Sequence, residues 1–167
     1  MHDPDAWAYA TFMKSSSFRI IPLPTEIAEA ARRAARKGAP DHCVVTADSP
    51  CGYPCRHCLR FAQPGDYVIL FPYAAIPPGR PYSENGPIFV HAEPCERYDA
   101  TRVFPADFRT GRVMRAYNSN NDMIDAQVVN GREPEAVIEE FLQNSETAFV
   151  DVRSVTRGCY TFRIQRA

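Results

Sequence analysis

The segment from Cys51 to Arg60, with the sequence CGYPCRHCLR, holds the densest group of chemically active side chains in the chain. Within it, Cys55-x-x-Cys58 has the spacing of a zinc knuckle, although Leu59 stands where a glycine usually follows the second cysteine. A second pair, His91-x-x-x-Cys95, lies further along the chain. Three thiolates and one imidazole are ligands that tetrahedral zinc takes. The first interpretation is therefore a zinc site with the candidate ligands Cys55, Cys58, His91 and Cys95. With all four in place the zinc would be structural, and with water replacing one it would be catalytic.

The same cysteines also allow a redox or nucleophilic interpretation. Arg56 and His57 lie between Cys55 and Cys58, and positive groups lower the pKa of a neighbouring thiol. Cys51 offers a second thiol with which Cys55 could form a disulfide. No helix is predicted to begin at Cys55, however, as it would in thioredoxin. The simplest alternative is that cysteines serve as small buried apolar side chains, which we favour for Cys43 and Cys159.

A third interpretation is a pocket for an anion, because arginine forks bind carboxylate and phosphate well. On a strand, Arg115 and Tyr117 would share one face, and a buried arginine there needs an acidic partner. That partner is either a ligand or a protein acid such as Asp125 or Asp151, which would make the arginine part of a structural ion pair. The candidate ligand-binding residues are Arg56, Arg115, Tyr117 and Arg157. The candidate catalytic residues are Cys55, His57, His91 and Tyr82.

Composition excludes several classes of function. The chain has 167 residues and a formal net charge of −1, which argues against bulk electrostatic binding of nucleic acid or an anionic membrane. No apolar run is long enough to span a bilayer, and the acidic N-terminus does not resemble a secretion signal. We therefore expect a cytoplasmic protein with reduced thiols, and a small anionic molecule as its partner. The sequence also lacks a phosphate-binding loop, a dinucleotide-binding turn and a serine-hydrolase elbow.

Hydrophobic patterning and turn residues predict an α+β fold in one domain, 17–167, preceded by a lead-in over residues 1–16. Its sheet should be mostly antiparallel and could close into a barrel. One short helix is predicted over 25–37, with Arg32, Arg33 and Arg36 on its solvated face, and a second begins at Pro134. Strands are predicted over 17–23, 43–46, 66–73, 87–92, 111–117, 123–129, 147–155 and 159–165, and the region 93–109 stays ambiguous.

Four segments of the chain resemble a bacterial family known only as domain of unknown function 1203. They are Pro54-Cys55-Arg56 with the following leucine and Gly65, the segments 86–92 and 115–117, and Arg157-Gly158-Cys159-Tyr160. The similarity extends from about Phe18 to the C-terminus. The resemblance implies a stand-alone domain and no particular activity. It also implies that His57, Cys58, His91 and Cys95 belong to a subset of the family.

These observations lead to one prediction and two alternatives. We predict an uncharacterised small-molecule enzyme or binder for an anionic ligand, with a Cys/His site that could contain zinc. The first alternative is a non-catalytic interaction module held together by a structural zinc. The second is a thiol redox protein. The residues are compatible both with catalysis and with binding alone.

Overall fold

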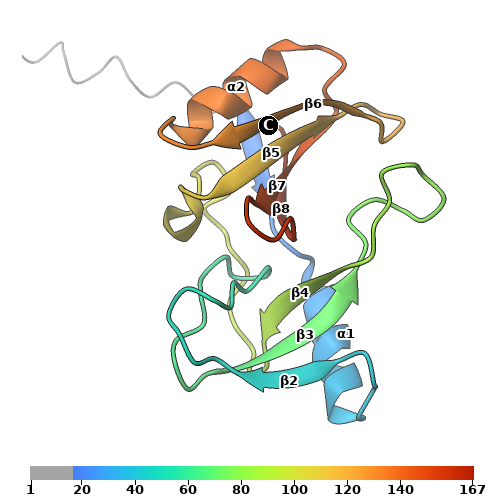
Figure 1. Cartoon of the computed structure of the whole chain (residues 1–167), viewed down its shortest axis with the longest axis vertical. Helices are drawn as coiled ribbons and strands as arrows, with labels where there is room; N and C mark the ends of the chain where they lie inside the picture. The colour runs from blue at the N-terminus through green and yellow to red at the C-terminus, as the bar shows by residue number, and fades with distance from the viewer. Residues whose placement is uncertain (1–16) are drawn as a thin grey trace, which may run out of the picture.

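The computed structural model describes residues 17–167, so the lead-in predicted for residues 1–16 lies outside the described residues. All pairings between named strands are antiparallel, and they form two separate sheets (Figure 1). The larger sheet has the order β1-β8-β7-β5-β6, with β1 Phe18–Ile21, β5 Arg112–Tyr117, β6 Met123–Val129, β7 Phe149–Ser154 and β8 Tyr160–Arg166. The smaller sheet has the order β2-β3-β4, with β2 Cys43–Thr46, β3 Tyr67–Tyr73 and β4 Gly86–His91.

Each sheet is covered by one helix. Helix α2, Pro134–Gln143, begins with proline at its first position and packs its apolar side chains against the larger sheet. That core includes Val137, Phe141, Met114 and Phe162. Helix α1, Thr25–Arg36, packs Ala28 and Ala31 in a second cluster with residues of β3 and β4. Each helix therefore belongs to its own hydrophobic cluster, and Tyr160 at the start of β8 joins the cluster of α1.

The predicted fold class, α+β with mostly antiparallel strands and two short helices, is confirmed, but the barrel is not. The first and last strands do pair, since β1 runs beside β8, yet β6 remains an edge of the larger sheet. The smaller sheet has its own edges at β2 and β4. The ambiguous region 93–109 contains one short 3-10 helix, Ala106–Phe108. No helix in the described part of the chain is long and apolar enough to cross a membrane.

The long connection between β2 and β3 positions the chemically active segment. Figure 1 draws it beside β4, at a level between the two sheets. Two isolated bridges hold it, one from Pro54 to Phe61 within the connection and one from Cys55 to Phe89 of β4. The chain returning from β4 adds a further contact, because Tyr98 N donates to His57 O at 3.0 Å. The segment is therefore fixed against the smaller sheet and faces the larger one.

Candidate metal centre

The structure brings the four predicted zinc ligands together. The ligand atoms of Cys55, Cys58, His91 and Cys95 all lie within 4.8 Å of one another. Cys55 Sγ is 3.9 Å from Cys95 Sγ, and Cys58 Sγ is 3.5 Å from His91 Nδ1. A tetrahedral zinc ion with ordinary bond lengths would separate two sulfurs by about 3.8 Å, and a sulfur from a nitrogen by about 3.5 Å. The donor set therefore fits a zinc ion in both chemistry and size.

A tight turn aims both knuckle cysteines at the same point. Cys55 N donates to Arg60 O at 2.9 Å, and Leu59 N donates to Cys55 O at 3.0 Å. Leu59 has a φ of +54°, the left-handed conformation that a glycine usually supplies after the second cysteine. Its side chain is 2% exposed and belongs to the main core, so burial offsets the strain of the turn. The missing glycine thus leaves the knuckle geometry intact.

Strand β4 delivers the second pair of ligands. Arg56 N donates to Phe89 O at 3.0 Å, which aligns the turn with the end of β4. His91, the last residue of β4, is then beside Cys55, and its backbone N–H lies 3.4 Å from Cys55 Sγ. Cys95 follows after Pro94, which begins the return of the chain. Hydrogen bonds from backbone N–H groups to thiolates are a stabilising feature of metal–thiolate sites.

Two side chains contact the cluster from outside, and one of them corrects a prediction. Arg32 was expected on a solvated helix face, but it is 4% exposed. Its Nη2 lies 3.6 Å from Cys95 Sγ, and its Nε donates to His91 O at 3.1 Å. Zinc with three thiolates and a neutral imidazole carries a net charge of −1, which the Arg32 guanidinium would balance.

His57 is the second outer contact and not a free acid–base group. Its Nδ1 lies 3.3 Å from Cys95 Sγ, and its Nε2 lies 2.9 Å from Thr25 Oγ1. With Nδ1 protonated, His57 donates to the Cys95 thiolate and accepts from the Thr25 hydroxyl. Burial lowers the pKa of His57, which favours this neutral form. His57, predicted as a catalytic residue, therefore contacts the candidate ligand Cys95 and the first residue of α1.

The close spacing of the candidate ligands shifts the pKa values of Cys55, Cys58 and His91. Hydrogen bonds from Cys58 and Cys95 hold the pKa of Cys55 well below its usual value. The same network raises the pKa of Cys58. Hydrogen bonding to Cys55 and Cys95 raises the pKa of His91 to about 10. Buried thiolates need positive charge beside them, and a divalent cation supplies it directly.

The remaining cysteines lie outside this cluster. None of the six cysteines forms a disulfide. Cys43, predicted to be buried, is exposed on the edge strand β2, and Cys159 is partly buried. Cys51 is exposed and lines a cavity on the other side of the turn.

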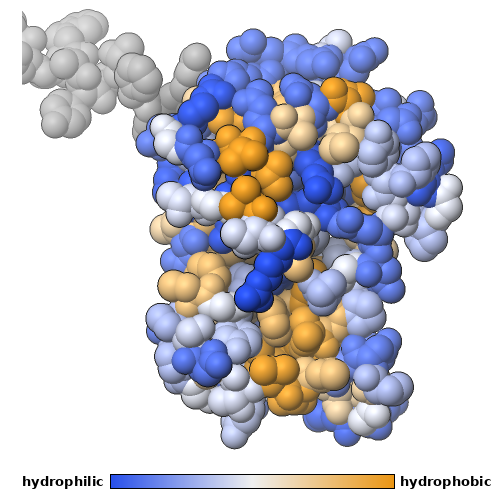
Figure 2. Space-filling view, viewed as in Figure 1, coloured by the Kyte–Doolittle hydropathy of each residue, from blue (hydrophilic) through white to orange (hydrophobic). Residues whose placement is uncertain are grey.

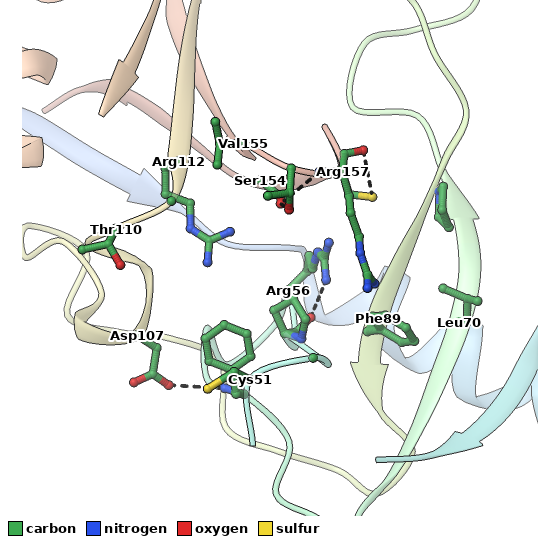
Figure 3. A pocket seen from close by; sticks show the side chains of 17 residues that line it. Cys51, Arg56, Leu70, Phe89, Asp107, Thr110, Arg112, Ser154, Val155 and Arg157 are labelled. Carbon is green, nitrogen blue, oxygen red and sulfur yellow. Dashed lines mark hydrogen bonds between the residues drawn. The ribbon is translucent and has the colours of Figure 1, made fainter. Parts of the chain in front are cut away.

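That cavity, with a volume of about 590 Å³, lies between the two sheets and contains two of the four predicted ligand-binding residues (Figure 3). Arg56 and Arg157 line it, together with Arg112, which the sequence analysis missed. Arg115 and Tyr117 do not line it. Arg115 is opposite Asp151 in the register of β5 and β7, and the Tyr117 ring stacks on a neighbouring phenylalanine.

Tyr82 is separated from the metal cluster by the length of β4. It precedes the start of that strand, whereas His91 ends it. The Tyr82 ring contacts the ring of Tyr117, with centroids 6.2 Å apart. The structure thus gathers Cys55, His57 and His91 but leaves the fourth candidate catalytic residue elsewhere.

Comparison with known proteins identifies the family. No curated protein and no solved structure matches the chain. A family described as "Protein of unknown function (DUF1203)" matches residues 52–166, a range that begins within the cysteine-containing turn and covers both ligand pairs. Since this match covers more than half of the sequence, the chain belongs to the DUF1203 family.

Proposed function

We propose that this protein binds a small anionic molecule and contains a structural zinc ion that shapes its binding site. One observation carries the proposal: successive residues of a single tight turn serve both sites. Cys55 and Cys58 belong to the group of four candidate zinc ligands, whereas Arg56 between them lines the cavity between the sheets. A zinc ion at the cluster would therefore fix the position of an arginine in the anion site.

Four protein ligands support a structural role for the metal. A tetrahedral zinc bound by three cysteines and one histidine has no open position for substrate or water. Two of the thiols, Cys55 and Cys58, are buried, which also disfavours a redox role for them. When bound, the zinc would supply cross-links between the turn and the end of β4.

Binding without catalysis is the form of the proposal that the cavity supports. None of the four candidate catalytic residues lines it. His57 and His91 are engaged at the metal cluster, and Tyr82 packs against Tyr117. The cavity instead presents arginines, the side chains best suited to hold an anion.

Two measurements on the purified full chain test the proposal. Elemental analysis of protein prepared without chelator should find about one equivalent of zinc. Cobalt substituted at the site should show the visible absorption of a tetrahedral thiolate complex. A panel of small anions should raise the melting temperature, whereas matched cations and neutral molecules should not. Protein without metal but with a Cys55–Cys95 disulfide would instead establish the thiol redox alternative, and a panel without effect would remove the anion-binding function.

Replacing Arg32 by methionine should weaken zinc binding without removing a ligand. The change keeps an unbranched apolar chain in place of the aliphatic part of arginine but deletes the charged guanidinium beside Cys95 Sγ, so we expect the zinc dissociation constant to rise about 10- to 100-fold. Competition with a chromophoric chelator measures this constant. Arg33→Met is the matched control, because Arg33 is exposed on the same helix and pairs only with Glu29 among the described residues. Equal affinities of the two variants would show that Arg32 does not stabilise the site.

A further inference from the structure

The cavity between the sheets combines a cationic wall with an apolar one. From the larger sheet come Thr110 to Arg112 and the turn Ser154–Arg157, and from the smaller sheet Leu70, Pro87 and Phe89. A volume of about 590 Å³ is in the range that holds a small organic molecule. Figure 2 shows apolar surface gathered in the lower middle of the molecule, where Figure 1 draws β3 and β4.

Arg112 is a buried cation without an acidic partner among residues 17–167. It is 8% exposed, and its Nε has no hydrogen-bond partner in the described part of the chain. Its guanidinium lies over the Phe108 ring, 4.8 Å from the centroid, and burial lowers its pKa. Arg153 and Arg163 of the larger sheet differ from it, because Arg153 pairs with Glu84 and Arg163 with Asp151. A buried charge without a partner costs considerable free energy, which a bound anion would repay.

Arg56 faces the same space with its geometry already fixed. Its Nε donates to Tyr160 O at 2.8 Å, and its Nη1 donates to Pro54 O at 2.5 Å. Within the described residues, Nη2 has no such partner and could bind a ligand. Burial, with a smaller contribution from the charge of Arg112, lowers the pKa of Arg56 to about 10. The two positive charges repel each other, so an anion placed between the arginines would stabilise both.

Figure 3 shows the guanidinium groups of Arg56, Arg112 and Arg157 turned toward a common space from three different segments. Arg157 is exposed, so it extends the positive charge to the mouth of the cavity. The acidic side chain on this wall, Asp107, accepts a hydrogen bond from Phe61 N at 3.3 Å. None of Cys58, His91 and Cys95 lines the cavity, so a ligand there would not reach the metal.

Resting on the proposed function, we propose that this cavity binds an organic carboxylate with an apolar body, its carboxylate held by Arg112 and Arg56. The planar fork of an arginine matches a carboxylate with two parallel hydrogen bonds. The body of the ligand then lies against Leu70, Phe61 and Phe89, which are half-buried in the free protein. An inorganic anion would leave this apolar wall in contact with water.

Isothermal titration of the zinc-loaded full chain with 3-phenylpropionate tests the ligand class. We expect saturable binding, with binding of the neutral analogue 3-phenylpropanol at least about tenfold weaker. Equal binding of the two compounds would overturn the role of the carboxylate. If inorganic phosphate binds and 3-phenylpropionate does not, the carboxylate proposal fails and the anion-binding function stands. If no anion binds, both fail.

Variants locate the site. Arg112→Met should weaken binding of 3-phenylpropionate at least about tenfold, while Arg60→Met should not change it, since Arg60 is exposed in the same turn region outside the cavity. Arg157→Glu provides a test that does not depend on a buried position, because it reverses a charge on the surface. We expect it to weaken binding several-fold at low salt. Unchanged affinity in Arg157→Glu, or equal loss in Arg60→Met, would place the ligand elsewhere.

Discussion

Replacing Cys58 by serine is expected to reduce bound zinc from about one equivalent to below about a tenth of an equivalent. The melting temperature should fall sharply with it. Structural zinc contributes about 10–16 kcal/mol in small zinc-binding peptides, which is comparable with the whole stability of an ordinary domain. Without the ion, Cys55, His91 and Cys95 would remain close together around a partly buried space with nothing to bind.

Two comparisons isolate the effect of the metal. Cys43→Ser makes the same chemical change at an exposed position on β2, so zinc content and melting temperature should stay at wild-type values. A strong chelator added to the wild-type chain should reproduce the loss in Cys58→Ser, and added zinc should reverse it only in the wild type. Retention of full zinc by Cys58→Ser would show that the four residues do not form the site.

The candidate metal ligands could be predicted from sequence because each pair is local. The spacing of Cys55 and Cys58 places both on one turn, and His91 lies where a predicted strand ends. The absence of a glycine at position 59 is not evidence against a zinc knuckle here, because Leu59 adopts the same left-handed conformation and its buried side chain stabilises it. What the sequence did not contain was the distance between the two pairs, which depends on the contact between Cys55 and Phe89.

The burial of Arg32 beside Cys95 and of Arg112 in the cavity was not predicted, for related reasons. Alanines lie on several sides of α1, so their positions alone do not single out the buried face, and the apolar Ile27 is 37% exposed. The buried face instead carries Ala28, Ala31 and Arg32, and the spacing of these three was the available signal. Arg112 lies two residues before Met114 on β5, so both lie on the same face of the strand. The guanidinium of Arg112 packs there over the Phe108 ring, a contact that no local pattern predicts.

The division into two sheets also depends on contacts that are remote in sequence. Strands that are neighbours in sequence, such as β5 with β6 and β7 with β8, pair across short turns. The pairing of β1 with β8 and of β5 with β7 joins segments far apart along the chain, and no local pattern specifies it. The cavity exists because the sheets remain separate, so its location could not be predicted either.

Replacing Asp151 by alanine should destabilise the larger sheet by about 3–5 kcal/mol. Asp151 is fully buried and accepts two hydrogen bonds from Arg163, from Nε at 2.8 Å and from Nη2 at 3.1 Å. Arg163 is itself largely buried, with its guanidinium carbon 3.6 Å from the centroid of the Phe149 ring. Removing the carboxylate leaves that cation with Ala75 O as its remaining hydrogen-bond acceptor among the described residues. Urea unfolding measures the loss.

The double variant Asp151→Ala/Arg163→Met separates the cost of an unpaired charge from the loss of packing. If the uncompensated guanidinium is the main cause, the double variant should be more stable than Asp151→Ala alone by at least about 1 kcal/mol. If packing is the cause, the second substitution should add to the first. The pair therefore also separates two uses of arginine in this fold. Arg163 pairs with a protein carboxylate, whereas Arg112 has no such partner among the described residues, which is why we assign it to the proposed ligand site.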